Sequence, residues 1–135
     1  MDYKVVGEVL VSVQYKKQEH LLQVWIHKAS GLGGDRRENP DVSSFAKLYI
    51  FPPKKQKQKT SVIRGTKDPE FEESFHFVNL QEDMLSGQKL IFKLYNASRV
   101  KDELLGEANI FLGSINKEEK EVYHLDLLKK KSKVN

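Results

Sequence analysis

The stretch that decides the fold is KTSVIRGTKDPEFEESFHF, residues 59–77. Its last six residues place Phe75 and Phe77 at alternate positions, and this period of two predicts a strand over residues 72–77. Pro69 ends the turn-rich piece RGTKDP, because its fixed backbone angle leads the chain out of the turn. Burying one phenylalanine fully is worth about 1.5–3 kcal/mol, so this strand is expected to carry part of a hydrophobic core.

The same alternation recurs along the whole chain. It predicts strands over residues 9–15, 22–26, 45–51, 59–63, 72–77, 89–95, 104–112 and 121–127. Two short pieces, 81–85 and 114–120, are each expected to form a helical turn. Many short strands with turns between them predict an all-β fold, here an eight-stranded antiparallel β-sandwich. The side chains expected in its core are Val11, Val24, Leu48, Phe71, Phe75, Phe77, Leu90, Phe92 and Leu94.

Length and composition limit the remaining choices. The 135 residues suit one domain over 1–135, with a packed core over about 7–128 and a solvated basic tail over 129–135. There is no cysteine, so disulfides are excluded. The first residues, MDYKVVGEVL, do not resemble a signal peptide, and no apolar run approaches the roughly 20 residues of a membrane span. We therefore expect a cytoplasmic protein that meets membranes only at their surface.

Sequence signatures of catalysis are missing. The chain has no Gly-x-Ser-x-Gly elbow, no phosphate-binding glycine loop and no cysteine nucleophile. Its four histidines stand singly within or beside predicted strands, without the spacing of a metal site. The sequence therefore predicts a binding module rather than an enzyme.

Taken in order, the motifs resemble the C2 domains of synaptotagmins and conventional protein kinase C over about residues 7–128. The most specific phrase is DPEFEESFHF (68–77), where the family has Asn-Pro-x-Phe/Trp-Asn-Glu-x-Phe-x-Phe. Leu105-Gly106-Glu107 matches the family's Leu/Ile-Gly-Glu. The resemblance implies the synaptotagmin-type sandwich and a role in docking on membranes or protein partners.

In the calcium-binding members of this family, loops at one end of the sandwich carry about five aspartates, because calcium takes 6–8 oxygen ligands. Here the third loop has Asn96 and Ser98 where the family has aspartates. The acids left as candidate ligands are Asp35, Asp41, Asp102 and Glu103. We expect these to be solvated loop residues, so no cofactor is predicted and calcium dependence is not expected. A weakened, residual calcium site is the alternative.

The resemblance also implies a lysine-rich sheet face that binds phosphoinositide headgroups. The matching residues are Lys47, Lys57, Lys59 and Tyr95, and Lys54 and Lys55 extend the cluster. Alternation supports one shared face, since Lys47 lies between residues that can face the core. Tyr49 and Ser61 stand where the family usually has further lysines.

The predicted function is calcium-independent docking on anionic phospholipid membranes. The alternative is a protein-interaction module with exposed Trp25, Phe45 and Tyr49 as contact anchors, since aromatic residues dominate interface hot spots. Nucleic acid is not an expected partner, because the stacking motifs of RNA-binding sheets are missing. A solvated hairpin tip is the other reading of residues 54–59.

Overall fold

The computed structural model describes residues 2–33 and 42–131, which form eight strands and three short 3-10 helices. The strands are β1 (Tyr3–Lys16), β2 (Leu21–Ser30), β3 (Ser44–Phe51), β4 (Lys55–Lys59), β5 (Glu70–Phe77), β6 (Lys89–Asn96), β7 (Glu103–Phe111) and β8 (Glu121–Lys130). The 3-10 helices are η1 (Lys17–Glu19), η2 (Glu82–Gly87) and η3 (Leu112–Ser114). Most of the chain is therefore extended, as the alternation predicts.

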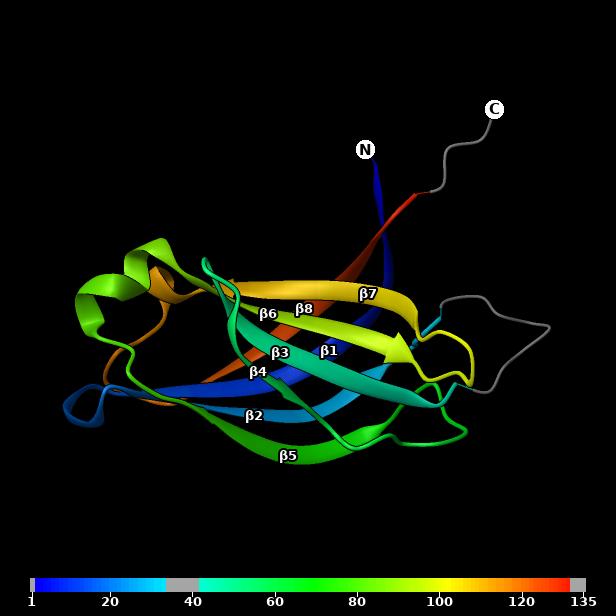
Figure 1. The fold of residues 1–135 in the computed structure, drawn as a ribbon, viewed down its shortest axis with the longest axis horizontal. Helices are drawn as coiled ribbons and strands as arrows, with labels where there is room; N and C mark the ends of the chain where they lie inside the picture. Colours follow the sequence, from blue (N-terminus) through cyan, green and yellow to red (C-terminus); the bar gives the residue numbers. More distant parts are fainter. Residues whose placement is uncertain (1, 34–41, 132–135) are drawn as a thin grey trace.

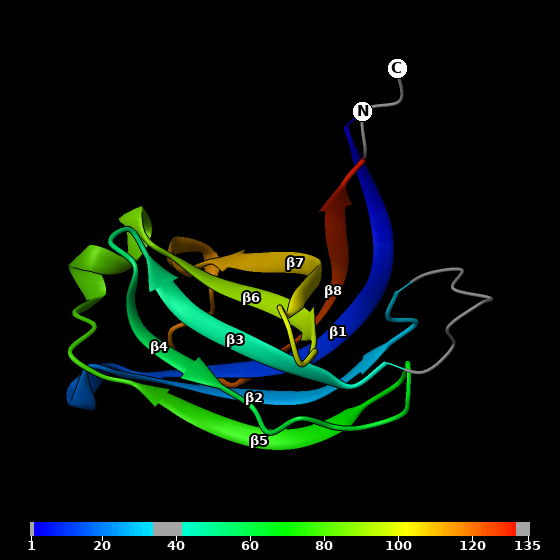
Figure 2. The same cartoon turned by 45° about the vertical axis from the view of Figure 1, so that its right-hand side comes forward.

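The strands pair antiparallel in the order β4-β3-β6-β7-β8-β1-β2-β5. Within the described residues, β7 and β8 pair only at Glu107 and Leu128. The order therefore divides into two layers, β4-β3-β6-β7 and β8-β1-β2-β5, which lie face to face in Figures 1 and 2. The predicted eight-stranded antiparallel sandwich is confirmed.

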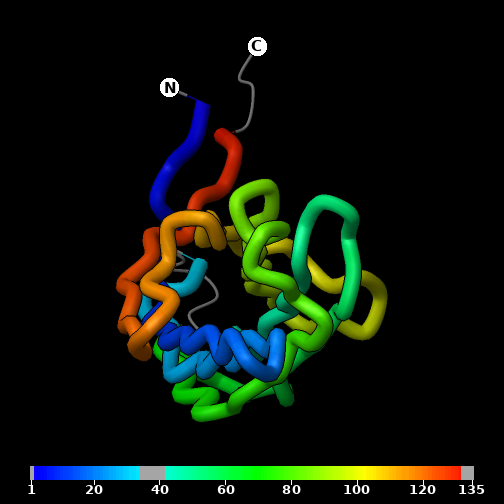
Figure 3. The backbone as a smooth tube through the Cα atoms, turned by 90° about the vertical axis from the view of Figure 1, so that its left-hand side faces the viewer, coloured from blue at the N-terminus to red at the C-terminus, as the bar shows by residue number. Residues whose placement is uncertain are grey.

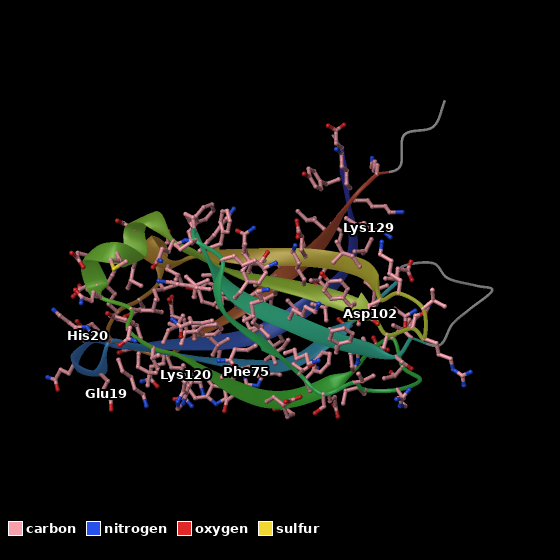
Figure 4. The ribbon with its side chains drawn as sticks, viewed as in Figure 1. Glu19, His20, Phe75, Asp102, Lys120 and Lys129 are labelled. Atoms are coloured by element: carbon pink, nitrogen blue, oxygen red, sulfur yellow. The ribbon has the colours of Figure 1, made fainter. Side chains whose placement is uncertain are left out.

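The hydrophobic core fills the space between the two layers. Eight of the nine side chains expected there are buried: Val11, Val24, Leu48, Phe71, Phe77, Leu90, Phe92 and Leu94. Phe75 is the exception, because it is only partly buried and packs against the margin of the core. It lies on β5, opposite Val24 of β2, and β5 is the last strand in the order, with no further strand beside it (Figure 4).

The fourth strand lies earlier in the chain than predicted. The sequence favours residues 59–63, but β4 is Lys55–Lys59 and pairs with β3 so that Lys59 lies opposite Lys47. Beyond it, Thr60 is buried and still bonds to β3: its backbone N–H donates to the Ala46 carbonyl, and its hydroxyl accepts a hydrogen bond from the Ala46 backbone N–H, both at 2.9 Å. The predicted range 59–63 was wrong because the strand is polar, KQKQK, and is defined by its backbone pairing with β3 rather than by apolar alternation.

One of the two predicted helical turns is present. The turn expected over 81–85 corresponds to η2. The turn expected over 114–120 is wrong, because η3 ends at Ser114 and bends follow it. There the Asn116 side-chain oxygen accepts hydrogen bonds from the backbone N–H groups of Glu118 and Glu119, at 2.7 and 3.0 Å. These local bonds favour a turn in place of a helix.

The two ends of the described chain pair with each other. Tyr3 lies opposite Lys130 and Lys4 opposite Lys129, so β1 and β8 are longer than predicted. We call this pair, residues 2–6 with 128–131, the terminal arm. It rises from the sandwich with both ends on the same side (Figures 2 and 3). Part of the predicted solvated tail over 129–135 is therefore strand, and residues 132–135 lie outside the described part.

The base of the terminal arm depends on a glycine. Gly7 has φ +141°, and a Cβ there would lie 2.7 Å from the Ser30 carbonyl oxygen. The pairing between β1 and β8 shifts register between Val5 and Glu8, so the chain changes direction at this point. Only glycine combines this backbone angle with so close an approach.

Candidate functional site: a basic pocket on one sheet face

The outer face of β3 carries the first lysine of the site. Ala46 and Leu48 point into the core and are fully buried, whereas Lys47 between them is half-buried on the opposite side. This is the alternation expected of a strand with one face on the core. Phe45 and Tyr49 share the outer face with Lys47.

Strand register places three lysines side by side on this face. Lys47 on β3 lies opposite Lys59 on β4 and opposite Lys93 on β6. Residues directly opposite in antiparallel strands have Cβ atoms about 4.5–5.5 Å apart, so this row concentrates positive charge. Glu107 on β7 continues the row, and its Oε2 lies 3.9 Å from the Lys93 Nζ.

Strands β3, β4 and β6 and the β3–β4 turn line a pocket of about 80 Å³. Its lining consists of Lys47, Tyr49, Lys54, Lys57, Lys93 and Tyr95. We call this set the basic pocket. Four of the six residues predicted for lipid binding are in it, whereas Lys55 and Lys59 are outside its lining. Lys93 and Tyr49 are the two members that the sequence did not assign to the site.

Aromatic rings hold the lysines of the basic pocket in place. Phe45 and Tyr95 stack with their centroids 5.5 Å apart, and the Lys47 Nζ lies 4.7 Å from the Tyr95 centroid. Tyr49 lies between two cations, with the Lys54 Nζ 4.8 Å from its centroid. The Lys93 Nζ is 5.7 Å from the same centroid. Contacts of this kind attract a cation to the ring face and restrict the otherwise flexible lysine chains.

The burial of these rings corrects one expectation. Phe45 and Tyr49 are 6% and 7% exposed, so they are not the exposed contact anchors that the protein-interaction alternative requires. Trp25 lies half-buried on the outer face of the other layer, and the Lys120 Nζ is 3.9 Å from its ring centroid. The lysines and the neighbouring rings therefore cover these aromatic surfaces.

The pKa values of two lysines of the pocket, Lys54 and Lys93, are shifted by their surroundings. The pKa of Lys54 is lowered, first by the charge of Lys57, then by partial desolvation, and then by Lys93 and Lys47. Burial also lowers the pKa of Lys93, but the hydrogen bond with the Tyr49 hydroxyl and the nearby Glu107 carboxylate outweigh it, so that its pKa is raised. A polyanion in the pocket would relieve the repulsion among these cations.

The loop acids expected as weak calcium ligands do not form a cluster in the part of the chain that the structure describes. Asp35 and Asp41 lie outside the described residues. Asp102 accepts a hydrogen bond of 3.1 Å from the Ser98 backbone N–H, and Glu103 begins β7 (Figure 4). Over residues 2–33 and 42–131, no three His, Cys, Asp or Glu side chains are placed to hold a metal ion.

Asn96 has a structural role at the end of β6. Its side-chain oxygen accepts a hydrogen bond of 3.0 Å from the Ser43 backbone N–H. The Ala97 N–H also bonds to the Ser43 carbonyl at 2.7 Å. These bonds fasten the start of β3 to the end of β6, so the amide oxygen is already occupied by the protein.

A serine, a histidine and a carboxylate also meet on the opposite layer. The Ser12 Oγ is 2.8 Å from the His27 Nε2, and the His27 Nδ1 is 3.5 Å from a Glu72 carboxylate oxygen. Such an order of groups resembles a nucleophilic triad. Ser12, however, is only 1% exposed, so its hydroxyl is closed to a substrate. We interpret the contact as a structural bond between β1 and β2.

Comparisons with known proteins bear on the family and the fold of this chain. The family model described as "C2 domain" matches residues 20–127. Human Synaptotagmin-4 is 31% identical over 110 residues, covering 81% of this chain and 26% of that protein. Human Synaptotagmin-10 is 35% identical over 108 residues, covering 78% of this chain and 20% of that protein. The chain thus spans about a quarter or less of the length of these relatives.

Solved structures show the same fold. A C2 domain of RIM from Drosophila superposes with a TM-score of 0.80 at 24% identity, covering 91% of this chain and all of that one, 100%. The third C2 domain of the KIAA1228 protein also gives a TM-score of 0.80, at 20% identity, covering 96% of this chain and 92% of that one. Among the described residues, no helix is both long and apolar enough to cross a bilayer.

Proposed function

We propose that this chain, which belongs to the C2 domain family as a domain of the synaptotagmin type, docks on anionic phospholipid membranes. We propose further that this docking does not require calcium. One observation carries the proposal, namely the convergence of Lys47, Lys54, Lys57 and Lys93 in a single pocket. The docking role is that of a peripheral module on the cytoplasmic side of a membrane, and it is a binding role rather than a catalytic one.

The chemistry of the pocket favours a multiply charged phosphate headgroup. Because the pocket is small, about 80 Å³, we expect a phosphate group to enter it and the rest of a lipid to stay outside. Each basic side chain near an anionic leaflet contributes about 1 kcal/mol, and four of them contribute about 4 kcal/mol. That corresponds to a dissociation constant of about a millimolar, so the domain assists recruitment rather than anchoring a protein alone.

The proposal of calcium independence rests on the loop beside β6. Calcium sites need several carboxylates, whereas here Asn96 supplies a neutral oxygen that already bonds to Ser43. Ser98 offers only a hydroxyl, and its backbone N–H binds the Asp102 carboxylate. The side-chain oxygens of Asn96 and Asp102 thus already accept backbone hydrogen bonds, which supports a loop that keeps its shape without calcium.

Vesicle co-sedimentation tests both parts of the proposal. We expect binding to phosphatidylcholine vesicles that contain phosphatidylinositol bisphosphate, weak binding to phosphatidylcholine alone, and no difference between calcium and a chelator. The triple variant Lys47→Glu, Lys54→Glu and Lys57→Glu should lose this binding, because it reverses three charges in the pocket. A thermal melt of the variant checks that it is folded, because Lys47 is half-buried, whereas changes at exposed sites such as Lys54 and Lys57 usually cost under about 0.5 kcal/mol each.

A matched variant controls for net charge. Lys4→Glu, Lys28→Glu and Lys130→Glu change the charge equally, and all three residues are exposed and outside the pocket lining. This control should keep most of the vesicle binding. Equal losses in the two triple variants would show that overall charge, and not the pocket, attracts the membrane. A marked gain in binding with calcium would contradict calcium independence.

A further inference from the structure

Two exposed phenylalanines flank a lysine on the same sheet face as the basic pocket. Phe51 ends β3, Lys89 begins β6 and Phe111 ends β7, and register places Lys89 directly opposite both phenylalanines. The Lys89 Nζ lies 5.9 Å from each ring centroid. Phe51 is 41% exposed and Phe111 is 64% exposed. We call these three residues the aromatic row.

The aromatic row lies on paired strands and is continuous with the basic pocket. Lys89, Ile91 and Lys93 alternate on the outer side of β6, and each is half-buried, whereas the residues between them face the core. Lys93 is four positions after Lys89, a distance of about 13 Å along a strand. The row and the pocket therefore form one strip. It is positively charged at the pocket and mainly aromatic where β3 and β7 end and β6 begins.

The chemistry of the row fits the boundary region of a lipid bilayer. Large aromatic rings bury their apolar faces there, and a neighbouring cation meets the phosphates of anionic lipids. Lys89 is suited to this contact, because no described carboxylate lies within ion-pair distance of it, whereas Lys93 is close to Glu107. The core does not need the rings of Phe51 and Phe111, because the inward-facing residues of β3, β6 and β7 already fill it. The two rings instead expose apolar surface to solvent.

We propose that the aromatic row is a second membrane contact, in which Phe51 and Phe111 enter the headgroup and acyl boundary of a bilayer containing anionic lipid. The inference rests on the proposed function and adds the orientation of the bound domain. The layer β4-β3-β6-β7 faces the bilayer, with the basic pocket over a headgroup and the row beside it. The other layer, with Trp25 and Val122, faces away.

A double alanine variant separates the row from the pocket. Phe51→Ala with Phe111→Ala should weaken binding to phosphatidylcholine vesicles containing phosphatidylinositol bisphosphate by about tenfold, because partial burial of two rings is lost. Binding of soluble inositol trisphosphate should not change, since the pocket lining is intact. The matched control is Val5→Ala with Val122→Ala, because these residues are 58% and 61% exposed and lie outside the aromatic row, Val5 in the terminal arm and Val122 on β8. It should bind vesicles like the parent protein.

A tryptophan placed in the aromatic row tests its contact with the bilayer without relying on the double alanine variant. Trp25 is the single tryptophan of the chain, so Trp25→Phe with Phe111→Trp leaves one indole in the row. Its emission should shift to the blue on the same vesicles and be quenched by brominated phosphatidylcholine.

Three outcomes would have distinct meanings. Vesicle binding without quenching, or an unchanged affinity of the double alanine variant, would overturn the membrane contact and point to a protein as the occupant of the row. Absent binding of inositol trisphosphate and of anionic vesicles by the parent protein would instead refute the proposed function itself. Quenching together with a tenfold loss would support both.

Discussion

Gly106 on β7 lies against Val6 of β1 and Leu127 of β8, and Gly106→Ala is expected to destabilise the fold. A Cβ at this position would lie 2.6 Å from the Val6 Cγ2 and 3.2 Å from the Leu127 Cβ. Both neighbours are buried, and the branched side chain of Val6 is restricted at its first side-chain torsion. The added methyl therefore cannot be accommodated without moving β1 or β7.

The size of the effect follows from this overlap. Overpacking a well-packed site by one methyl costs about 1–3 kcal/mol, and we expect about 2 kcal/mol here. For 135 residues the entropy of unfolding near 60 °C is about 0.28 kcal/mol/K, so the melting temperature should fall by about 7 °C. Urea unfolding and a thermal melt both measure this change.

A second substitution tests the stated cause. Val6→Ala removes the clashing methyl, so the double variant with Gly106→Ala should be more stable than the sum of the single changes by about 1 kcal/mol. Gly87→Ala is the matched control, because a Cβ there meets nothing within 4 Å, and it should stay within about 0.5 kcal/mol of the parent. A Gly106→Ala variant as stable as this control, or strict additivity with Val6→Ala, would refute the argument.

Other predictions concern single hydrogen bonds and charges. Tyr15→Phe should lower the free energy of unfolding by about 1–2 kcal/mol in urea, because the Tyr15 hydroxyl donates a buried bond of 2.5 Å to the Leu80 carbonyl; an unchanged midpoint would count against it. Lys57→Ala should raise the pKa of Lys54 in an NMR titration, since Lys57 is the largest cause of its lowering. Phosphoinositide affinity of the parent should fall as pH rises through the pKa of Lys54, where that cation is lost, and a flat profile would exclude Lys54 from binding.

Much of the fold could be predicted because apolar alternation reports directly on burial. Val24, Leu48 and Phe92 stand at alternate positions in their strands, and each is fully buried as expected. Phe75 shows the limit of the pattern, since alternation gives the face of a strand but not its place in the sheet. Phe77, two residues further along the same edge strand, is fully buried, so the partial exposure of Phe75 follows neither from alternation nor from the edge position alone.

The basic pocket was only partly predictable for a related reason. Lys54 and Lys57 are clustered in the sequence, so local charge was a sufficient signal. Lys93 lies among the apolar residues of β6, far in sequence from the other lysines of the pocket, and only the register between β3 and β6 brings it beside Lys47. Phe51 and Phe111 are likewise distant in sequence and become neighbours of Lys89 through pairing. The place of Lys93 in the basic pocket and the aromatic row both depend on the register between strands distant in sequence, which alternation within one strand does not predict.

The terminal arm has a mechanical consequence. Lys131 donates a 2.6 Å backbone hydrogen bond to Asp2, so the two ends of the described chain leave the domain side by side (Figure 2). In an antiparallel pair the ladder bonds run perpendicular to the strands. A force that separates two segments attached at these ends would open the ladder between β1 and β8 one bond at a time. Such peeling meets little resistance, so under tension β1 and β8 would separate before the other strand pairs.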